Sequence, residues 1–486
     1  MPTVTCRRSG LQDRRVQTRE SLWRRVLAVA LPETPTRAYW IALIGTAVLL
    51  RLIVSFVVLG GMPVFSDAKN YSGQAVDLLH GRTHLPYYWP PGTSYLLAAG
   101  YWLFGIHRWV AHLVMLVLNV GAVITTVLIA RRLLRNERSA LLAGWILALY
   151  PGMILQVSQP DSFDPTLIGV NLTALFALRA WDEGHIYDYA LAGLALGLAA
   201  LSRPASLILL LPMGVIAVVA LRRRREQGTA TGLGRIAIGS AALVACAAAT
   251  VAPAIAHNIV NHEGPTISVN NELNTWLGNN PYTPNYKTDD IGQHPIDGYP
   301  PAEQRYLRRF IYGEIPTRAQ RTADLNEAKR FVEDHPAISF WRTLNRVRGF
   351  WGFEYSISNT FRVQWGKGAK AEAVGLVFEA GGYAVLAVLT IIGLLFAREL
   401  LRPGGLWFLL GLIAAFELPY ALVYGAGRWH YPVLGLVAVI GGAGAAWLID
   451  TPDRWRRLRT STAFWVVMAV FVLIQIEYAY YIVRPG

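Results

Sequence analysis

Polar side chains able to carry acid–base and phosphate chemistry stand beside long apolar runs in this sequence. They are Asp67, Asp161, Asp164, Arg203, Arg428 and His430. An ionised side chain next to an apolar run must be solvated, paired or used, because burying it alone costs several kcal/mol. A carboxylate can take the proton of an attacking hydroxyl group, and cationic groups can hold a departing phosphate. Together these residue types fit the transfer of a group from a phosphate carried by a lipid.

The composition indicates a chain that crosses a membrane many times. Apolar residues make up 53% of the chain and charged residues 16%. The apolar residues occur in runs of about 20, the length that crosses a hydrocarbon core. The net charge of +14 does not indicate nucleic acid, because the basic residues cluster in short loops such as 222–225. Cys6 and Cys246 should lie at different depths, so we expect no disulfide framework.

Eleven apolar segments are expected to span the membrane, which predicts an all-α polytopic protein. If the N-terminal tail is cytoplasmic, the basic segments all fall on the same side: 131–138, 222–225, 398–402 and 454–459. The polar loop 61–92 and the polar residues 257–373 then fall outside. The expected spans lie near residues 39–60, 111–130, 141–157, 166–180, 189–201, 205–221, 236–255, 375–397, 405–424, 431–449 and 463–483.

This topology divides the chain into four parts. They are a basic cytoplasmic tail (1–37), an N-terminal transmembrane module containing loop 61–92 (38–256), an external soluble domain of mixed secondary structure (257–373) and C-terminal transmembrane helices (374–486). No cleavable signal peptide precedes the first apolar segment, so that segment is expected to stay as an anchor.

Two further segments have helical character outside the expected spans. Residues 93–106 are apolar but too short to cross, which predicts a helix in or near the interface. Residues 319–351 have the spacing of a single amphipathic helix. Its apolar set is Ala328, Phe331, Val332, Ile338, Phe340, Leu344 and Val347.

The first polar loop resembles the first external loop of GT-C glycosyltransferases that use polyprenyl-phosphate sugars. The matching positions are Asp67, Tyr71, Ala75, Leu-Leu-His-Gly at 78–81, Tyr88, Pro-Pro-Gly at 90–92, Leu-Leu at 96–97 and Leu-Phe-Gly at 103–105. This group includes protein O-mannosyltransferases, lipid A aminoarabinose transferases and bacterial transferases of the dolichyl-phosphate-mannose type.

Three later stretches extend the resemblance over most of residues 40–450. Asp-Pro at 164–165 resembles an acidic-Pro step after the third span, Arg-Pro at 203–204 resembles an Arg-Pro turn, and 278–281 resembles the Gly-Asn-Asn-Pro segment of bacterial members. One departure is Trp89, which stands where aminoarabinose transferases have a Lys, so either another cation serves the phosphate here or the donor sits differently.

The resemblance implies a GT-C helix bundle and an inverting enzyme. It would move a monosaccharide from a polyprenyl phosphate to a glycan, lipid or protein acceptor on the outer face of the cytoplasmic membrane. Asp67 would be the general base and Asp164 a second catalytic carboxylate. The donor phosphate would contact Arg203, Arg428 and His430, and the substrates would contact Asp161, Tyr71, Tyr88, Asn279 and Asn280.

Each of these residues also has a purely structural interpretation. Asp67 and Asp164 could cap helices, Arg203 could anchor a span in the headgroups, and the Gly-Asn-Asn sequence could be only a tight turn. Arg51 and Glu417 stand within expected spans, where we expect them to pair with groups inside the bundle.

Two other functions are compatible with the same features. A lipid or glycan transporter or flippase would use charges within the spans, but no internal repeat is evident and the polar residues gather at one face. A glycan ligase or polymerase would share the surface and differ in its donor. No cofactor is required, and a divalent metal is left open, although His257, His262 and His294 lack the close spacing of a zinc site.

Overall fold

The computed structural model describes residues 29–483 except 83–84, 227–232, 284, 286–299, 303, 306, 308–314, 364 and 424. His294, Cys6 and most of the basic tail lie outside the described residues. The described part is a helical bundle, and its one β pairing is an isolated bridge between Leu134 and Leu401. Seven of the described helices are long and apolar enough to cross a membrane. The predicted all-α polytopic fold is confirmed, and the number of eleven spans stays a prediction.

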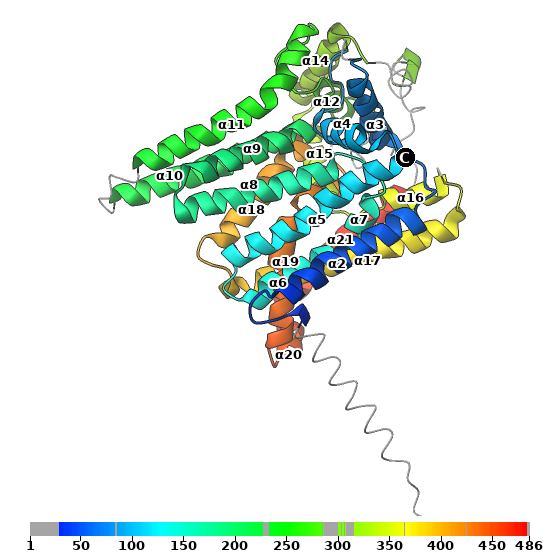
Figure 1. Cartoon of the computed structure of the whole chain (residues 1–486). Helices are drawn as coiled ribbons and strands as arrows, with labels where there is room; N and C mark the ends of the chain where they lie inside the picture. Colours follow the sequence, from blue (N-terminus) through cyan, green and yellow to red (C-terminus); the bar gives the residue numbers. More distant parts are fainter. Residues whose placement is uncertain are drawn as a thin grey trace, which may run out of the picture.

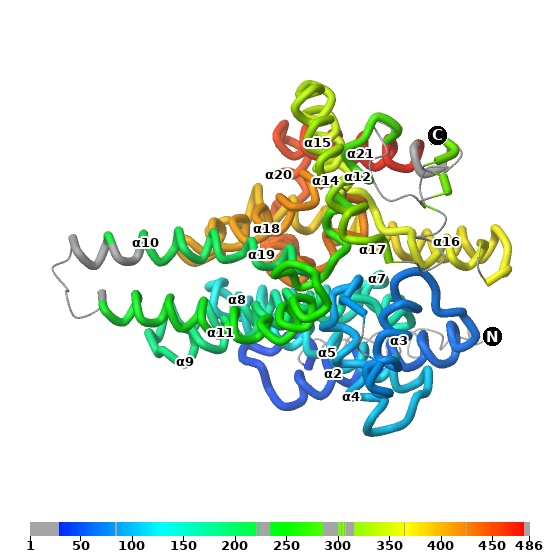
Figure 2. The backbone as a smooth tube through the Cα atoms, turned by 90° about the horizontal axis from the view of Figure 1, so that it is seen from above, coloured from blue at the N-terminus to red at the C-terminus, as the bar shows by residue number. Residues whose placement is uncertain are grey.

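Every expected span coincides with a helical segment, and most of these segments run side by side (Figure 1). They are α2 (Arg37–Leu52) continuing into the π-helix η1 (Ile53–Val58), α5 (Arg108–Leu133), α6 (Glu137–Ala148) with α7 (Pro151–Gln156), α8 (Phe163–Glu183), α9 (Ile186–Ser202), the 3₁₀-helix η2 (Pro204–Leu209) with α10 (Leu210–Glu226), α11 (Leu233–Val260), α17 (Gly368–Phe396), α18 (Gly405–Leu422), η7 (Gly427–Val433) with α19 (Leu434–Asp450), and α21 (Thr462–Val483). In Figure 2, α10 and α11 extend together beyond the other helices.

The segment expected to span at 141–157 is broken between α6 and α7. Pro151 begins α7 and has no backbone N–H, and the helix is broken at this point. The last carbonyl groups of α6 therefore lack the N–H partners that a continuous helix would supply one turn later. Arg51 supplies them: its guanidinium donates to the carbonyls of Ala148 (2.9 Å) and Leu147 (3.5 Å). This contact explains how an arginine can be fully buried in α2, and it confirms that Arg51 pairs inside the bundle.

The segments between the spans at one end of the bundle are also helical. They are α3 (Ser66–Leu79), α4 (Gly92–Phe104), α12 (Asn271–Gly278), α14 (Arg318–Asp334), α15 (Pro336–Phe350) and α16 (Ser356–Val363). The described parts of 257–373 thus contain helices where mixed structure was expected. Two short elements, η6 (Arg398–Leu400) and α20 (Arg454–Thr460), lie in the basic loops.

The prediction of one helix over 319–351 is wrong. His335 leaves the helical conformation at the end of α14 (φ −129°, ψ 57°), and Pro336 starts α15 at its first position. The residue before a proline disfavours the α conformation, and a proline has no N–H for the preceding turn. Because of this break, the orientation of α15 about its own axis is not fixed by that of α14. Its Phe340 is consequently 65% exposed, although it was expected on the apolar inner face.

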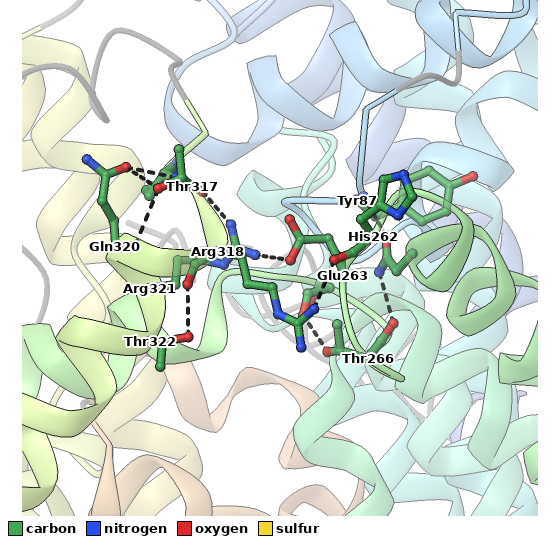
Figure 3. Close-up of polar contacts among 12 residues, drawn as sticks. Tyr87, His262, Glu263, Thr266, Thr317, Arg318, Gln320, Arg321 and Thr322 are labelled. Carbon is green, nitrogen blue, oxygen red and sulfur yellow. Dashed lines mark hydrogen bonds and ion pairs between the residues drawn. The ribbon is translucent and has the colours of Figure 1, made fainter.

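The loop after α11 is tied to both α14 and the segment before α4 (Figure 3). Arg321 forms a buried ion pair with Glu263, and Arg318 donates to the carbonyl of His262 (3.1 Å). On the other side, the side chain of Asn258 accepts from the backbone of Tyr87 (2.8 Å). These bonds hold the start of the 257–373 region against the end of loop 61–92.

Close backbone contact then brings α4 to the end of α9. A Cβ added at Gly92 would lie 2.6 Å from both the backbone carbon of Leu201 and Oγ of Ser202. Only glycine permits this approach, which accounts for the last residue of the Pro-Pro-Gly sequence. The contact sets the end of loop 61–92 beside Arg203, which caps the C-terminal end of α9.

Candidate active site

The centre of the candidate site is the hydroxyl group of Tyr71. Asp67 lies half-buried in the first turn of α3, and Tyr71 follows one turn later on the same face. The Tyr71 ring is 4% exposed. Its hydroxyl bonds to Ser162 and lies within the electrostatic reach of Asp161, Asp67 and Arg203. Burial first, and then the two carboxylates, raise the pKa of Tyr71, so its phenol stays neutral and can donate a hydrogen bond.

Arg203 lies between two aromatic rings. Its guanidinium carbon is 4.1 Å from the centre of the Phe163 ring and 4.4 Å from that of Trp429. Nη1 donates to the hydroxyl of Tyr420 (3.4 Å), whereas Nε has no hydrogen-bond partner among the described residues. The side chain is 7% exposed. A cation held by two desolvated ring faces is fixed in place and keeps its charge close to Asp161.

Arg428 also lies near the same two rings, at a greater distance. Its guanidinium carbon is 5.3 Å from the Trp429 ring and 5.9 Å from the Phe163 ring. Unlike Arg203, Arg428 lines a small hollow that is partly open to solvent. The hollow lies between the start of α3, the turn before α8 and the start of α16. It is lined by Phe65, Ser66, Ala68, Gln156, Gln159, Asp161, Phe163, Ser356, Ile357 and Arg428.

Asp164 does not line this hollow; it is buried beneath it and 1% exposed. Asn119 of α5 donates to its Oδ1 (2.7 Å), and so does the hydroxyl of Tyr431 (3.2 Å). Asn119 in turn accepts from Nε of Arg51 (2.6 Å). The sequence joined Asp164 to Asp67 as a catalytic pair, but the carboxylate at the hollow and beside Tyr71 is Asp161.

His430 is directed away from the hollow into the bundle. It is fully buried, with Nδ1 2.7 Å from the carbonyl of Phe350 and Nε2 3.1 Å from Glu354. Its ring stacks on those of Trp351 and Tyr383. The four residues 428–431 of η7 thus reach four surroundings: the hollow, Arg203, the Glu354 carboxylate and Asp164.

The Gly-Asn-Asn segment lies beside the C-terminal end of α18. The amide of Asn279 donates to the carbonyls of Thr275 (3.0 Å) and Leu422 (3.3 Å). The Oδ1 atom of Asn280 accepts from the backbone of Tyr282 (2.8 Å), and its Nδ2 donates to Trp276 (2.7 Å). Both asparagines are buried and bonded within the protein. These contacts are those of a turn.

Tyr88 is also buried rather than open to the hollow. It is 3% exposed and packs edge-on against Trp89. Thus, of the ten residues expected at the site, the structure brings five close together. Arg203 and Arg428 share the Phe163 and Trp429 rings, and Asp67, Asp161 and Arg203 act on the Tyr71 hydroxyl.

Several residues of the site were not found from the sequence. Phe163, Trp429 and Tyr420 hold Arg203, and Asn119 and Glu354 hold the layer below. Asn119 could have been noticed in the sequence, because a polar side chain within a long apolar run is costly unless it is hydrogen-bonded inside the bundle. The described residues contain no group of three or more His, Cys, Asp or Glu side chains arranged to hold a metal ion.

Comparison with known proteins adds a family match. The model of the dolichyl-phosphate-mannose-protein mannosyltransferase family matches residues 89–252. No curated protein matches the chain. A solved structure of the oligosaccharyltransferase AglB from Archaeoglobus fulgidus, in complex with an inhibitory peptide and a dolichol-phosphate, aligns with a TM-score of 0.44 and 14% identity over 91% of this chain and 55% of AglB. ArnT from Cupriavidus metallidurans aligns with a TM-score of 0.33 and 15% identity over 83% of this chain and 77% of ArnT.

This chain therefore spans little more than half the length of AglB. The family match covers the end of loop 61–92, the Asp161–Asp164 turn and Arg203. It confirms the resemblance to GT-C membrane glycosyltransferases that the sequence motifs predicted.

Proposed function

We propose that this protein is an inverting glycosyltransferase that moves a monosaccharide from a polyprenyl phosphate to an acceptor hydroxyl outside the cytoplasmic membrane. The observation that carries the proposal is a cluster built from segments far apart in the chain: Asp161 and Arg428 line one open hollow. Beside them, the hydroxyl of Tyr71 lies within the electrostatic reach of Asp161, Asp67 and Arg203. The matching family, that of the dolichyl-phosphate-mannose-protein mannosyltransferases, supports the donor class.

In the proposed reaction the acceptor oxygen attacks the anomeric carbon while the bond from that carbon to the phosphate oxygen breaks. Asp67 takes the hydroxyl proton, and the polyprenyl phosphate leaves with the bonding electrons. Arg428, which is the more open cation, holds the leaving phosphate. Arg203 is fixed behind it by the two rings, so its charge needs no reorganisation during the reaction. Neutral Tyr71 and the carboxylate of Asp161 orient the acceptor.

The sequence-based topology puts this hollow on the external side of the membrane. The start of α3 and the start of α16 both border the hollow, and both belong to segments without cytoplasmic basic clusters. A lipid-anchored phosphate reaches this level without leaving the bilayer, which supports a lipid-linked donor over a soluble nucleotide sugar.

The test is transfer by purified protein in liposomes, supplied with polyprenyl-phosphate sugars and candidate acceptors. Asp67→Asn keeps the size of the side chain and removes the base, so transfer should fall by a factor on the order of a hundred to ten thousand. Asp77→Asn is the matched control, because Asp77 lies on the same helix in an exposed ion pair with Arg82. Near-normal transfer by Asp67→Asn would refute the assignment of the base.

Two further arms distinguish related mechanisms. A chain that uses only a polyprenyl-linked oligosaccharide is a ligase or polymerase rather than a monosaccharide transferase. Transfer that persists after a chelator assigns charge stabilisation to Arg428 and Arg203 alone, whereas loss of transfer assigns a divalent metal to Asp67 and Asp161.

A further inference from the structure

Helix α15 has its polar face buried and its apolar face exposed. The buried residues are Ser339, Arg342, Asn345, Arg346 and Phe350, of which only the last is apolar. On the opposite side, Phe340 is 65% exposed, Trp341 54% and Leu344 39%. A helix on the surface of a soluble domain shows the reverse arrangement. The exposed side of α15 therefore does not have the character of a face directed to water.

Hydrogen bonds fix this orientation, so α15 cannot turn its apolar face inward. Arg342 donates to the carbonyl of Asn280 (2.9 Å) and to the side chain of Asn285 (3.1 Å). Arg346 donates to the carbonyl of Leu422 at the end of α18 (2.9 Å) and also to Gly278. Rotating the helix would leave two buried guanidinium groups and these carbonyls without partners, at a cost of several kcal/mol.

The contacts of α15 also set its height relative to the membrane. Arg346 reaches the last carbonyls of α18, and Arg348 forms an ion pair with Glu477 near the end of α21. Both α18 and α21 are long and apolar enough to cross a bilayer. Figure 2 shows α15 on the same side of the molecule as these two helices. Helix α15 is thus level with the ends of two spans, where hydrocarbon meets the headgroups.

We propose that α15 lies in the outer leaflet of the bilayer, with Phe340, Trp341 and Leu344 inserted at the boundary between headgroups and acyl chains. The apolar surface continues from α18, whose Leu422 is 55% exposed at the same level. Continuity with a surface that faces lipid favours a bilayer over a protein partner as the occupant. A tryptophan at this depth is typical of membrane interfaces. The region 257–373, read from its sequence as soluble, is then seated on the membrane through this helix.

The proposal gives the lipid contact a route to the candidate site. Phe350, the last residue of α15, accepts a hydrogen bond from Nδ1 of His430 through its carbonyl oxygen. His430 belongs to η7, which also carries Arg428 and Trp429. The depth of α15 in the leaflet would therefore set the height of the phosphate-binding arginine above the membrane. This last consequence rests on the proposed function, whereas the lipid contact itself does not.

The experiment is depth-resolved fluorescence quenching on the full chain in phospholipid vesicles. Phe340→Cys and Leu344→Cys are introduced separately in a background without Cys6 and Cys246, and each is labelled with an environment-sensitive fluorophore. Lys329→Cys is the matched control, because Lys329 lies exposed on the neighbouring helix α14. Quenchers are a phospholipid with a spin label high on its acyl chain and aqueous iodide. Circular dichroism and gel filtration of each labelled protein check the fold.

We expect labels at 340 and 344 to be quenched several-fold more by the spin-labelled lipid than by iodide, and the label at 329 to show the opposite preference. Iodide quenching at 340 and 344 equal to that at 329 would overturn the proposal, since the face would then lie in water. Shielding from both quenchers would also overturn it and would indicate a protein partner. Either result leaves the assignment of Asp67 as base unaffected.

Discussion

Replacing Asn119 by alanine should be among the most destabilising single changes in the bundle interior. Asn119 is fully buried in α5 and joins two ionisable side chains. It accepts from Nε of Arg51 (2.6 Å) and donates to Oδ1 of Asp164 (2.7 Å). Asn119→Ala removes both bonds. Arg51 keeps its hydrogen bonds to the carbonyls of Ala47 and Ala148. Its buried guanidinium group therefore loses one of its partners but not all of them.

The chain contains a matched control for the size of this effect. Asn171 of α8 is equally buried, but its amide donates only to neutral groups: Ala122 (3.1 Å), Thr125 (3.2 Å) and Thr126 (3.1 Å). Interhelical hydrogen bonds between neutral groups in membranes average about 0.6 kcal/mol and reach about 1.7. Bonds to charged groups contribute about 1.5–3 kcal/mol each.

The two substitutions remove the same atoms from buried sites, so their cavity costs largely cancel in the comparison. We expect Asn119→Ala to lower the free energy of unfolding by about 2 kcal/mol more than Asn171→Ala. The assay is reversible unfolding in mixed detergent micelles, followed by circular dichroism at matched protein concentration. Equal losses, or a larger loss from Asn171→Ala, would show that the Arg51–Asn119–Asp164 chain contributes nothing beyond packing.

Three further predictions concern the donor site, the topology and the packing of α12. Arg428→Ala should weaken donor binding about ten- to a hundredfold in a folded protein, because a charge-assisted contact to phosphate contributes about 1.5–3 kcal/mol; unchanged donor dependence would leave the phosphate to Arg203 alone. A membrane-impermeant thiol reagent added outside right-side-out vesicles should modify Lys329→Cys and leave Arg222→Cys unmodified until the membrane is opened; equal labelling of both from outside would overturn the assigned sides. Gly278→Ala should lower thermal stability well beyond Gly45→Ala, since the added Cβ would lie 1.8 Å from a carbonyl oxygen just after α18, whereas Gly45 has open space around it; similar melting temperatures would indicate that α12 can shift without cost.

Local patterns in the sequence were sufficient to predict which segments of the chain form the long helices. The length of an apolar run is a property of neighbouring residues, and a bilayer leaves a helix as the only way to satisfy each backbone bond within such a run. Every expected span accordingly coincides with helix, even where Pro151 breaks the segment into α6 and α7. Residues 319–351 show the limit of the same argument. The amphipathic spacing of the sequence continues past Pro336, but the helix is interrupted there.

The order of the short motifs along the chain also predicted that Asp67, Tyr71, Asp161, Arg203 and Arg428 would lie near one another. Each of these residues stands in or next to a segment that joins two expected spans on the same side of the bundle. Once the spans alternate in direction, such residues must come to one face. The sequence analysis chose Asp164 over Asp161 as the second catalytic carboxylate, but of these two residues, three positions apart, it is Asp161 that lines the hollow. On a helix start this separation is nearly one turn, and the choice depends on how α8 is rotated against α5.

Tertiary contacts alone decided what each polar side chain touches. Arg203 meets Tyr420 across 217 residues of sequence, and Asn119 meets Tyr431 across 312. Adjacent residues in 428–431 point to different partners because a 3₁₀ turn spreads successive side chains around its axis. The orientation of α15 was also decided by tertiary contacts. Its sequence has one polar face and one apolar face, and does not show which of them packs against the protein. The carbonyls of Asn280 and Leu422 bind its arginines, so the polar face is turned inward. Sequence thus determined which segments become helices and which end of the bundle carries the chemistry, whereas the rotation of each packed helix determined which side chains reach it.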